Sequence, residues 1–200
     1  MADVFLMGTA GKYDDPNRSK WREPIKSACT KAGVSFFDPV VPEWNDKAMQ
    51  AEIEALRSAH VIVMAITADT AGIASLAESG WAALSAVTRR QAFGIYVDSI
   101  FVAEGFDPRL SQASADLMKF LRASRPIDPN APVDPNEKKN EVAELAEASR
   151  RARKLVDGHA TELAKQFPQL NMYVAESLYA LATWTVNTAL KMTGRTSGQK

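Results

Sequence analysis

The chain has 200 residues, and its 24 lysines and arginines balance 24 aspartates and glutamates, which argues against a dedicated nucleic-acid-binding protein. A hydrophobic fraction of 46% excludes a wholly disordered chain. The single cysteine excludes an internal disulfide framework. With only two histidines beside it, we expect no metal and no cofactor. No apolar run approaches the roughly 20 residues that span a bilayer, and no basic stretch precedes the first apolar run, so we expect a cytoplasmic protein without a membrane partner.

The first hundred residues alternate between apolar runs and segments of helical spacing. Four short apolar runs predict strands, at 4–7, 34–37, 61–66 and 92–97. Helical spacing predicts helices between them, from Trp21 onward, over 47–59 with Asp46 as the N-cap, and over 73–89. Strands separated by helices imply crossover connections and a parallel sheet. We therefore expect an α/β fold over 1–105, a Rossmann-like or flavodoxin-like three-layer sandwich with a mostly parallel sheet.

The second half predicts a helical C-terminal region over 106–200. Its expected segments are a helix over 111–123, a proline-rich linker over 125–136, one long helix or two joined near Gly158 over 137–167, and a last helix over 169–192. Four prolines in the linker favour extended or turning backbone. The last segment carries an apolar stripe with Tyr173, Leu181 and Trp184, which either packs on the α/β domain or mediates oligomerisation.

Candidate functional residues follow the predicted strands, because ligands bind outside the carboxyl ends of the strands in open parallel sheets. The segments concerned are Gly8-Thr9, Asp38-Pro39, 67–72 and Asp98-Ser99. The loop 8–11 is either a phosphate or sugar loop or a plain turn, and it matches neither G-x-G-x-x-G nor a Walker A loop. Glu78, early in the helix over 73–89, points back toward this cleft, although its position alone also suits a partner of the helix dipole.

Aromatic residues accompany two of the predicted loops. Asp14 and Asp15 precede Trp21, so they either bind a nucleobase by edge hydrogen bonds and stacking or form a solvated loop with a helix cap. Trp44 lies in a proline-bounded loop after the second strand. It is a ring platform, a lid, or a plug at the edge of the core.

Four segments in order resemble the nucleoside 2-deoxyribosyltransferase superfamily, in its deoxyribosyltransferase-like branch, over residues 3–100. They are the first strand and substrate loop at 4–9, Trp21-Arg22, the stretch from Phe36 to Trp44, and the strand and loop leading to Glu78. The resemblance implies a transferase or nucleotide N-glycosidase that acts at the anomeric carbon of a (deoxy)nucleoside or its 5′-monophosphate. It also implies a homo-oligomer in which a neighbouring subunit completes the pocket.

The resemblance further implies the roles of individual residues. The family's nucleophilic glutamate corresponds to Glu78, which attacks C1′ and displaces the base. Glu52 corresponds to a family carboxylate near the base, with Asp14 or Asp15 as alternatives, and Asp38 holds a sugar hydroxyl or the base. The substrate-binding set drawn from the resemblance and the local sequence is Phe5, Gly8, Thr9, Asp14, Asp15, Trp21, Asp38, Trp44, Asp69, Gly72, Ser75 and Trp81.

The chain departs from the family pattern just before Glu78. Where the family has Asp-x-Gly or a phosphate-binding serine, this chain has Gly72, with Asp69 upstream and Ser75 downstream. The family's Glu-Leu-Gly-Tyr is Glu-Ser-Gly-Trp here. These differences and the long helical region support an alternative, a non-catalytic nucleotide-binding or sensing module with a helical oligomerisation or partner surface. A purely structural assembly protein is a third reading.

Overall fold

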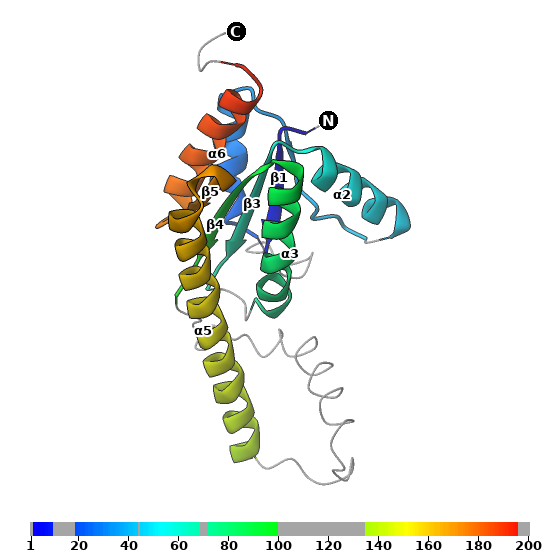
Figure 1. Ribbon diagram of the computed structural model, residues 1–200. Helices are drawn as coiled ribbons and strands as arrows, with labels where there is room; N and C mark the ends of the chain where they lie inside the picture. The colour runs from blue at the N-terminus through cyan, green and yellow to red at the C-terminus, as the bar shows by residue number, and fades with distance from the viewer. Residues whose placement is uncertain (1, 10–18, 44, 69–71, 100–134, 196–200) are drawn as a thin grey trace.

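The computed structural model describes residues 2–9, 19–43, 45–68, 72–99 and 135–195. Five parallel strands form one sheet in the order β2 (Phe36–Phe37), β1 (Val4–Gly8), β3 (Val61–Ile66), β4 (Ala92–Val97) and β5 (Met172–Val174) (Figure 1). This is the strand order of flavodoxin-like folds. The predicted α/β class and parallel sheet are therefore confirmed.

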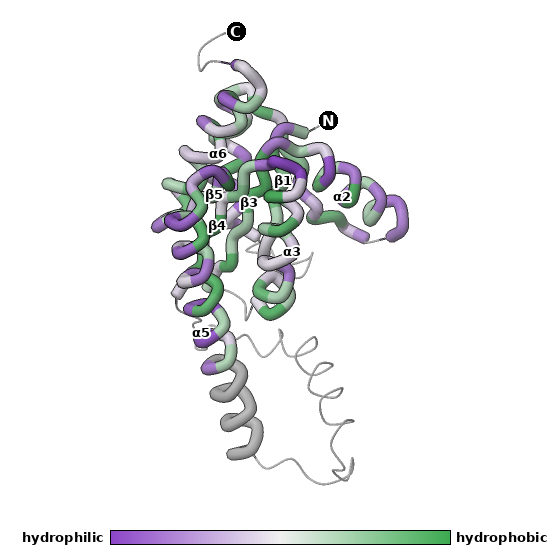
Figure 2. The backbone as a smooth tube through the Cα atoms, viewed as in Figure 1, coloured by the Kyte–Doolittle hydropathy of each residue, from purple (hydrophilic) through white to green (hydrophobic). Residues whose placement is uncertain are grey.

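Helices cover both faces of the sheet and complete three layers. One face carries α1 (Arg22–Lys31) and α6 (Leu178–Met192), and the other carries α2 (Asp46–Ser58), α3 (Ile73–Arg89) and α5 (Pro135–Gln166). Alternate side chains of each strand enter the two cores, because successive residues of a strand point to opposite faces. Hydrophobic residues are accordingly concentrated in the strands, while hydrophobic and hydrophilic residues alternate along the helices (Figure 2).

The central elements form where the sequence pattern predicts them. All six residues of β3 are buried, as expected for a parallel strand covered on both faces. α3 spans the predicted residues 73–89. Gly33 follows α1 with a φ of +67°, the left-handed conformation that glycine commonly adopts just after a helix.

Two local predictions need correction, and a third, which left one helix or two open, is decided. The N-cap of α2 is Asn45, whose side chain accepts a hydrogen bond from the Ala48 backbone N–H at 3.0 Å, and Asp46 is the first helical residue instead. α5 already begins at Pro135, so the end of the predicted linker is helical; proline suits a helix start, since the N–H it lacks would have no intrahelical partner there. α5 is a single helix that continues through Gly158. The predicted helix over 111–123 lies outside the described residues.

The predicted last helix is wrong at its beginning. Residues 172–174 form β5, which pairs with the open edge of β4, and α6 starts only at Leu178 after the Ser177 cap. The sheet therefore extends into the C-terminal region beyond residue 105. Tyr173 stacks on Trp184 with ring centroids 5.3 Å apart, and Leu181 is fully buried, so the apolar stripe packs on the sheet.

Two searches of the described residues gave no candidates. None of the described helices is long and apolar enough to cross a membrane. Nor does the described part of the chain bring together three or more histidine, cysteine, aspartate or glutamate side chains in a way that would hold a metal ion.

Candidate functional site

A cavity of about 430 Å³ lies at the carboxyl end of the sheet, where the strand arrows point in Figure 1. The end of β1, the loop after β2, helix α2 and the start of α3 form its walls. The residues that line it are Met7, Gly8, Thr9, Arg22, Pro39, Val40, Val41, Glu52, Gly72, Ile73, Ala74, Ser75 and Glu78. The strand order reverses between β1 and β3 at this place, which is where doubly wound sheets bind their ligands.

The floor of the cavity is made by backbone in unusually close contact. Gly8 has a φ of +129°, and a Cβ added to it would lie 2.1 Å from the Ala65 carbonyl oxygen, so only glycine fits. The Thr9 N–H donates to the same carbonyl at 2.9 Å. The Thr9 and Thr67 hydroxyls share a hydrogen bond of 2.7 Å, which fixes the ends of β1 and β3 side by side.

Three side chains from α1, the residue before it and the loop after β2 hold this floor in place: Trp21, Arg22 and Asp38. The indole Nε1 of Trp21 and the guanidinium of Arg22 both donate to the Thr9 carbonyl, at 2.8 and 2.9 Å. Arg22 Nε lies 3.3 Å from Asp38 Oδ1, and the guanidinium carbon lies 4.3 Å from the centre of the Trp21 ring. Arg22 is 2% exposed and lines the cavity, whereas Trp21 and Asp38 lie behind the wall.

Two carboxylates from different helices face the cavity. Glu52 comes from α2 and Glu78 from α3, and both line it. Glu78 remains exposed to solvent as a residue, but its carboxyl end is partly removed from water by the cavity walls. This loss of hydration raises the pKa of Glu78, and the negative charge of Glu52 raises it further. A carboxylate with a raised pKa in a cleft is typical of catalytic sites.

The start of α3 offers polar groups to the same cavity. Gly72, with a φ of +64°, is the N-cap of the helix and, as a glycine, has no side chain to cap the first turn. Ser75 is 5% exposed and lines the cavity, and its hydroxyl has no hydrogen-bond partner among the described residues. The first N–H groups of a helix have no intrahelical acceptor and suit anionic or polar ligands.

The structure brings six of the predicted residues together: Gly8, Thr9, Glu52, Gly72, Ser75 and Glu78 all line the cavity. Phe5 lies elsewhere, fully buried and stacked on Phe37. Trp81 is 75% exposed and does not line the cavity. The remaining predictions, Asp14, Asp15, Trp44 and Asp69, fall outside the described residues.

Several lining residues were not predicted. Arg22 follows Trp21 directly, and the helical spacing of α1 gave no sign that its guanidinium reaches the end of β1. Val40 and Val41 form an apolar wall in a loop whose approach to the cavity depends on tertiary packing. Two signals were usable, the Trp21-Arg22 pair and the segment from Asp38 to Val41, since both belong to stretches that resemble the family.

Comparison with protein families agrees with this geometry. Residues 1–92 match the model of a family described as nucleoside 2-deoxyribosyltransferase like, which confirms the resemblance seen in the sequence. The match includes every residue that lines the cavity. The comparison with curated proteins finds no match, and neither does the comparison with solved structures.

Proposed function

We propose, from the premise that residues 1–92 are a nucleoside 2-deoxyribosyltransferase-like domain, that this protein cleaves or transfers the N-glycosidic bond of a (deoxy)nucleoside or its 5′-monophosphate. Glu78 is the nucleophile and Glu52 serves the leaving base. The observation that carries the proposal is the pair of carboxylates on α2 and α3 that share one cavity of about 430 Å³.

The proposed reaction has two steps that suit this pair. In the first, a Glu78 carboxylate oxygen forms a bond to C1′ while the C1′–N bond breaks, and the electron pair leaves with the base. The base takes up a proton as it leaves, and Glu52, which lines the same cavity, is the group that delivers it. The transition state has oxocarbenium character, so the negative charge of Glu78 stabilises it before the covalent ester forms.

In the second step, water or another base attacks C1′ of the glycosyl-enzyme. The C1′–O bond to Glu78 breaks, Glu78 recovers its charge, and the attacking group gives its proton to Glu52. Glu78 and Glu52 are close enough to interact, because the negative charge of Glu52 adds to the rise in the pKa of Glu78 that desolvation mainly causes.

The remaining lining residues suit the sugar. The Gly8-Thr9 floor brings backbone close to the ligand without a side chain in the way. The Ser75 hydroxyl and the N-terminus of α3 would hold the 5′ group, whether it is a hydroxyl or a phosphate. Asp14, Asp15, Trp44 and Asp69 stay predicted contacts of the substrate, whereas Trp81 does not line the cavity.

Base release from a panel of nucleosides, deoxynucleosides and their 5′-monophosphates, followed by chromatography, tests the proposal. We expect Glu78→Gln to lose at least about 10³-fold in turnover, since it removes the nucleophile. Glu54→Gln is the matched control, because Glu54 is exposed on α2 and does not line the cavity. Intact-mass measurement of protein quenched during turnover should show a pentose adduct that Glu78→Gln lacks. Undiminished turnover in Glu78→Gln would rule out the mechanism.

A second candidate is a nucleotide sensor that binds in the same cavity without turnover. The exposure of Glu78 favours it, because an enzyme that forms a reactive ester usually excludes water. Thermal stabilisation by nucleotides with no released base would support the sensor. Size-exclusion chromatography with light scattering tests the predicted homo-oligomer, in which a neighbouring subunit would cover the open side.

A further inference from the structure

Arg153 of α5 is a fully buried cation that binds backbone at the carboxyl end of the sheet. Its exposed fraction is 0%. Its Nη1 donates to the Ile66 carbonyl at 3.1 Å and to the Asp98 carbonyl at 3.2 Å, and its Nη2 donates to the Thr67 carbonyl at 3.0 Å. Its Nε donates to the Ser149 hydroxyl one turn earlier, at 3.1 Å. One guanidinium therefore joins α5 to the last residues of β3 and to the residue after β4.

This guanidinium lies directly behind the cavity. A Cβ added to Gly72, which lines the cavity, would lie 3.2 Å from Arg153 Nη2 and 2.9 Å from Ile66 Cγ2. Thr67, whose carbonyl Arg153 holds, shares its hydroxyl hydrogen bond with Thr9 of the cavity floor. Arg153 is thus connected to the floor through Thr67 and to the start of α3 through Gly72.

We propose that Arg153 is a positioning residue for the glycosyl reaction, which sets the cavity floor at the right distance from Glu78. This inference rests on the proposed function. Arg153 lies outside residues 1–92, so the C-terminal part of the chain belongs to the working site although the family match ends before it. We expect Arg153 to act on the site through the backbone and not through its charge. The raised pKa of Glu78 has desolvation and the charge of Glu52 as its causes.

The geometry calls for arginine and not for any cation. A guanidinium presents its donors in a rigid planar fork, so it holds carbonyls of two adjacent strands and a hydroxyl of its own helix at once. Lysine offers one nitrogen on a flexible stem and would keep only part of this set. A neutral side chain would leave buried carbonyls of Ile66 and Thr67 without these donors, and the strand ends would shift.

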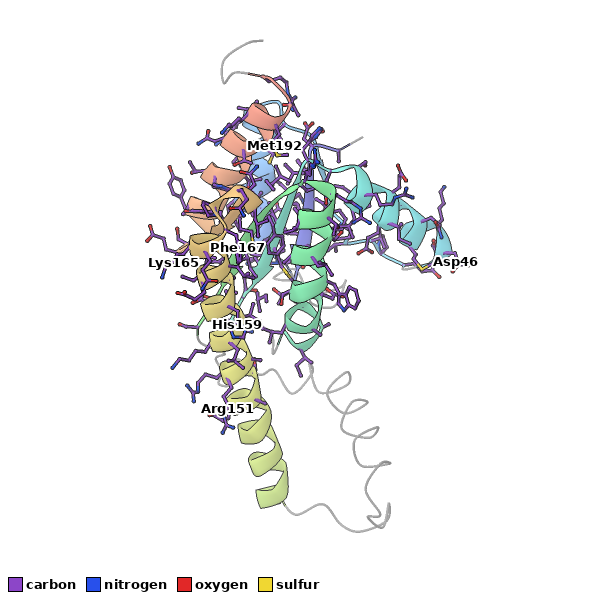
Figure 3. The ribbon with its side chains drawn as sticks, in the orientation of Figure 1. Asp46, Arg151, His159, Lys165, Phe167 and Met192 are labelled. Carbon is purple, nitrogen blue, oxygen red and sulfur yellow. The ribbon has the colours of Figure 1, made fainter. Side chains whose placement is uncertain are left out.

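Three variants separate positioning from mere stability. Arg153→Lys keeps the charge, Ser149→Ala keeps the arginine but removes one of the groups that orient it, and Arg151→Gln is the control. Arg151 is on the same helix, its side chain is 73% exposed, and it points away from the sheet (Figure 3). Each variant is assayed for kcat and KM well below its own melting temperature, so that only folded protein contributes.

We expect kcat to fall about 10- to 100-fold in Arg153→Lys, because a misplacement of about 1 Å costs on that order in rate. The kcat of Ser149→Ala should also fall, but by less. In both variants KM should change far less than kcat. Arg151→Gln should match the wild type. A kcat at the wild-type value in folded Arg153→Lys and Ser149→Ala, whatever the melting temperature, would overturn the proposal.

Hydrogen exchange gives a readout that does not need turnover. Positioning predicts faster exchange in Ser149→Ala confined to the amides around the strand ends, such as those of Thr67, Ala68 and Leu76, with the N-terminal part of α1 unchanged. Uniform acceleration over the whole chain, or none at these amides, would overturn positioning. Absence of any base release by the wild type would instead overturn the proposed function, so the two failures are distinguishable.

Discussion

The two ends of the central sheet are built in contrasting ways. At the amino end, one carboxylate joins three chain segments: Asp3 Oδ2 accepts from the Ser35 N–H and hydroxyl at 2.8 Å each, and from Arg195 Nη2 at 2.7 Å. At the carboxyl end, the chain leaves a cavity of about 430 Å³ that contains two acids of like charge and the Ser75 hydroxyl, which has no partner within the described part of the chain. One end is tied together, and the other leaves polar groups available.

The pKa values of the carboxyl groups express the same contrast. Burial raises the pKa of Asp3, but hydrogen bonds from Arg195 and Ser35 outweigh it, so the net shift is downward and the charge stabilises the fold. At the other end, desolvation and Glu52 raise the pKa of Glu78, so its charge opposes folding. Functional sites commonly lack the optimisation for stability that other regions have. The comparison therefore favours the carboxyl end as the candidate functional site, and it does so without the family resemblance.

Among the substitutions that test this contrast, we expect the largest effect from adding a side chain at position 8. Gly8→Ala places a methyl group 2.1 Å from the Ala65 carbonyl oxygen, at a φ of +129° that L residues rarely adopt. We expect a loss of about 3 kcal/mol or more in the free energy of unfolding, from the clash and the backbone strain together. Urea denaturation measures this loss of stability. The variant should also bind ligand less well, because the substitution distorts the floor of the cavity.

The control for this substitution is Gly158→Ala in α5, where an added Cβ meets no atom within 4 Å. Alanine in a helix interior is favoured over glycine by up to about 1 kcal/mol, so this variant should be slightly more stable than the wild type. If Gly8→Ala were as stable as the wild type, the close approach of β1 to β3 at the floor would be wrong.

A substitution of Glu52 tests the electrostatic part of this comparison, with a smaller expected effect on stability. Glu52→Gln removes the charge that helps to raise the pKa of Glu78, so that pKa should fall. The nucleophile must be ionised, and the acid limb of kcat/KM should therefore move to lower pH. Turnover at neutral pH should fall about 10²-fold with loss of the proton donor. An acid limb that stays in place would show that the two carboxylates do not interact, whereas Glu54→Gln should leave the profile unchanged.

Much of the carboxyl end could be predicted, for a physical reason. A buried strand such as β3 and an amphipathic helix such as α3 are each long enough for periodicity to identify them, and ligands of parallel sheets lie at strand ends. Gly8, Ser75 and Glu78 follow from these two facts together with the resemblance. Trp81 shows the limit of that reasoning, because proximity to Glu78 along the helix did not bring its indole to the cavity wall.

Local sequence patterns could not predict what the C-terminal part of the chain adds to the sheet and to the candidate site. Residues 172–174 are too short a run for periodicity to separate strand from helix, and they form β5 because β4 has an open edge to pair with. Arg153 meets Ile66 across 87 positions of the sequence, so no local pattern could signal the contact. Such contacts depend on how the completed layers pack, which is why long-range ties to the site appear only in the folded chain.

The smallest expected effect comes from the amino end, where Arg195 ties the C-terminal part to Asp3 and donates to the Gly33 carbonyl at 3.0 Å. Arg195→Gln should lower the free energy of unfolding by about 0.5 kcal/mol, since the arginine is partly exposed. The pKa of Asp3 is lowered, so this stabilisation is present above the ordinary value of 3.8 and is lost as pH falls through the folded pKa. Melting temperatures of variant and wild type should differ at pH 7 and converge in stronger acid, with kcat unchanged at pH 7. A clear loss of turnover in Arg195→Gln would mean that the two ends of the sheet are coupled.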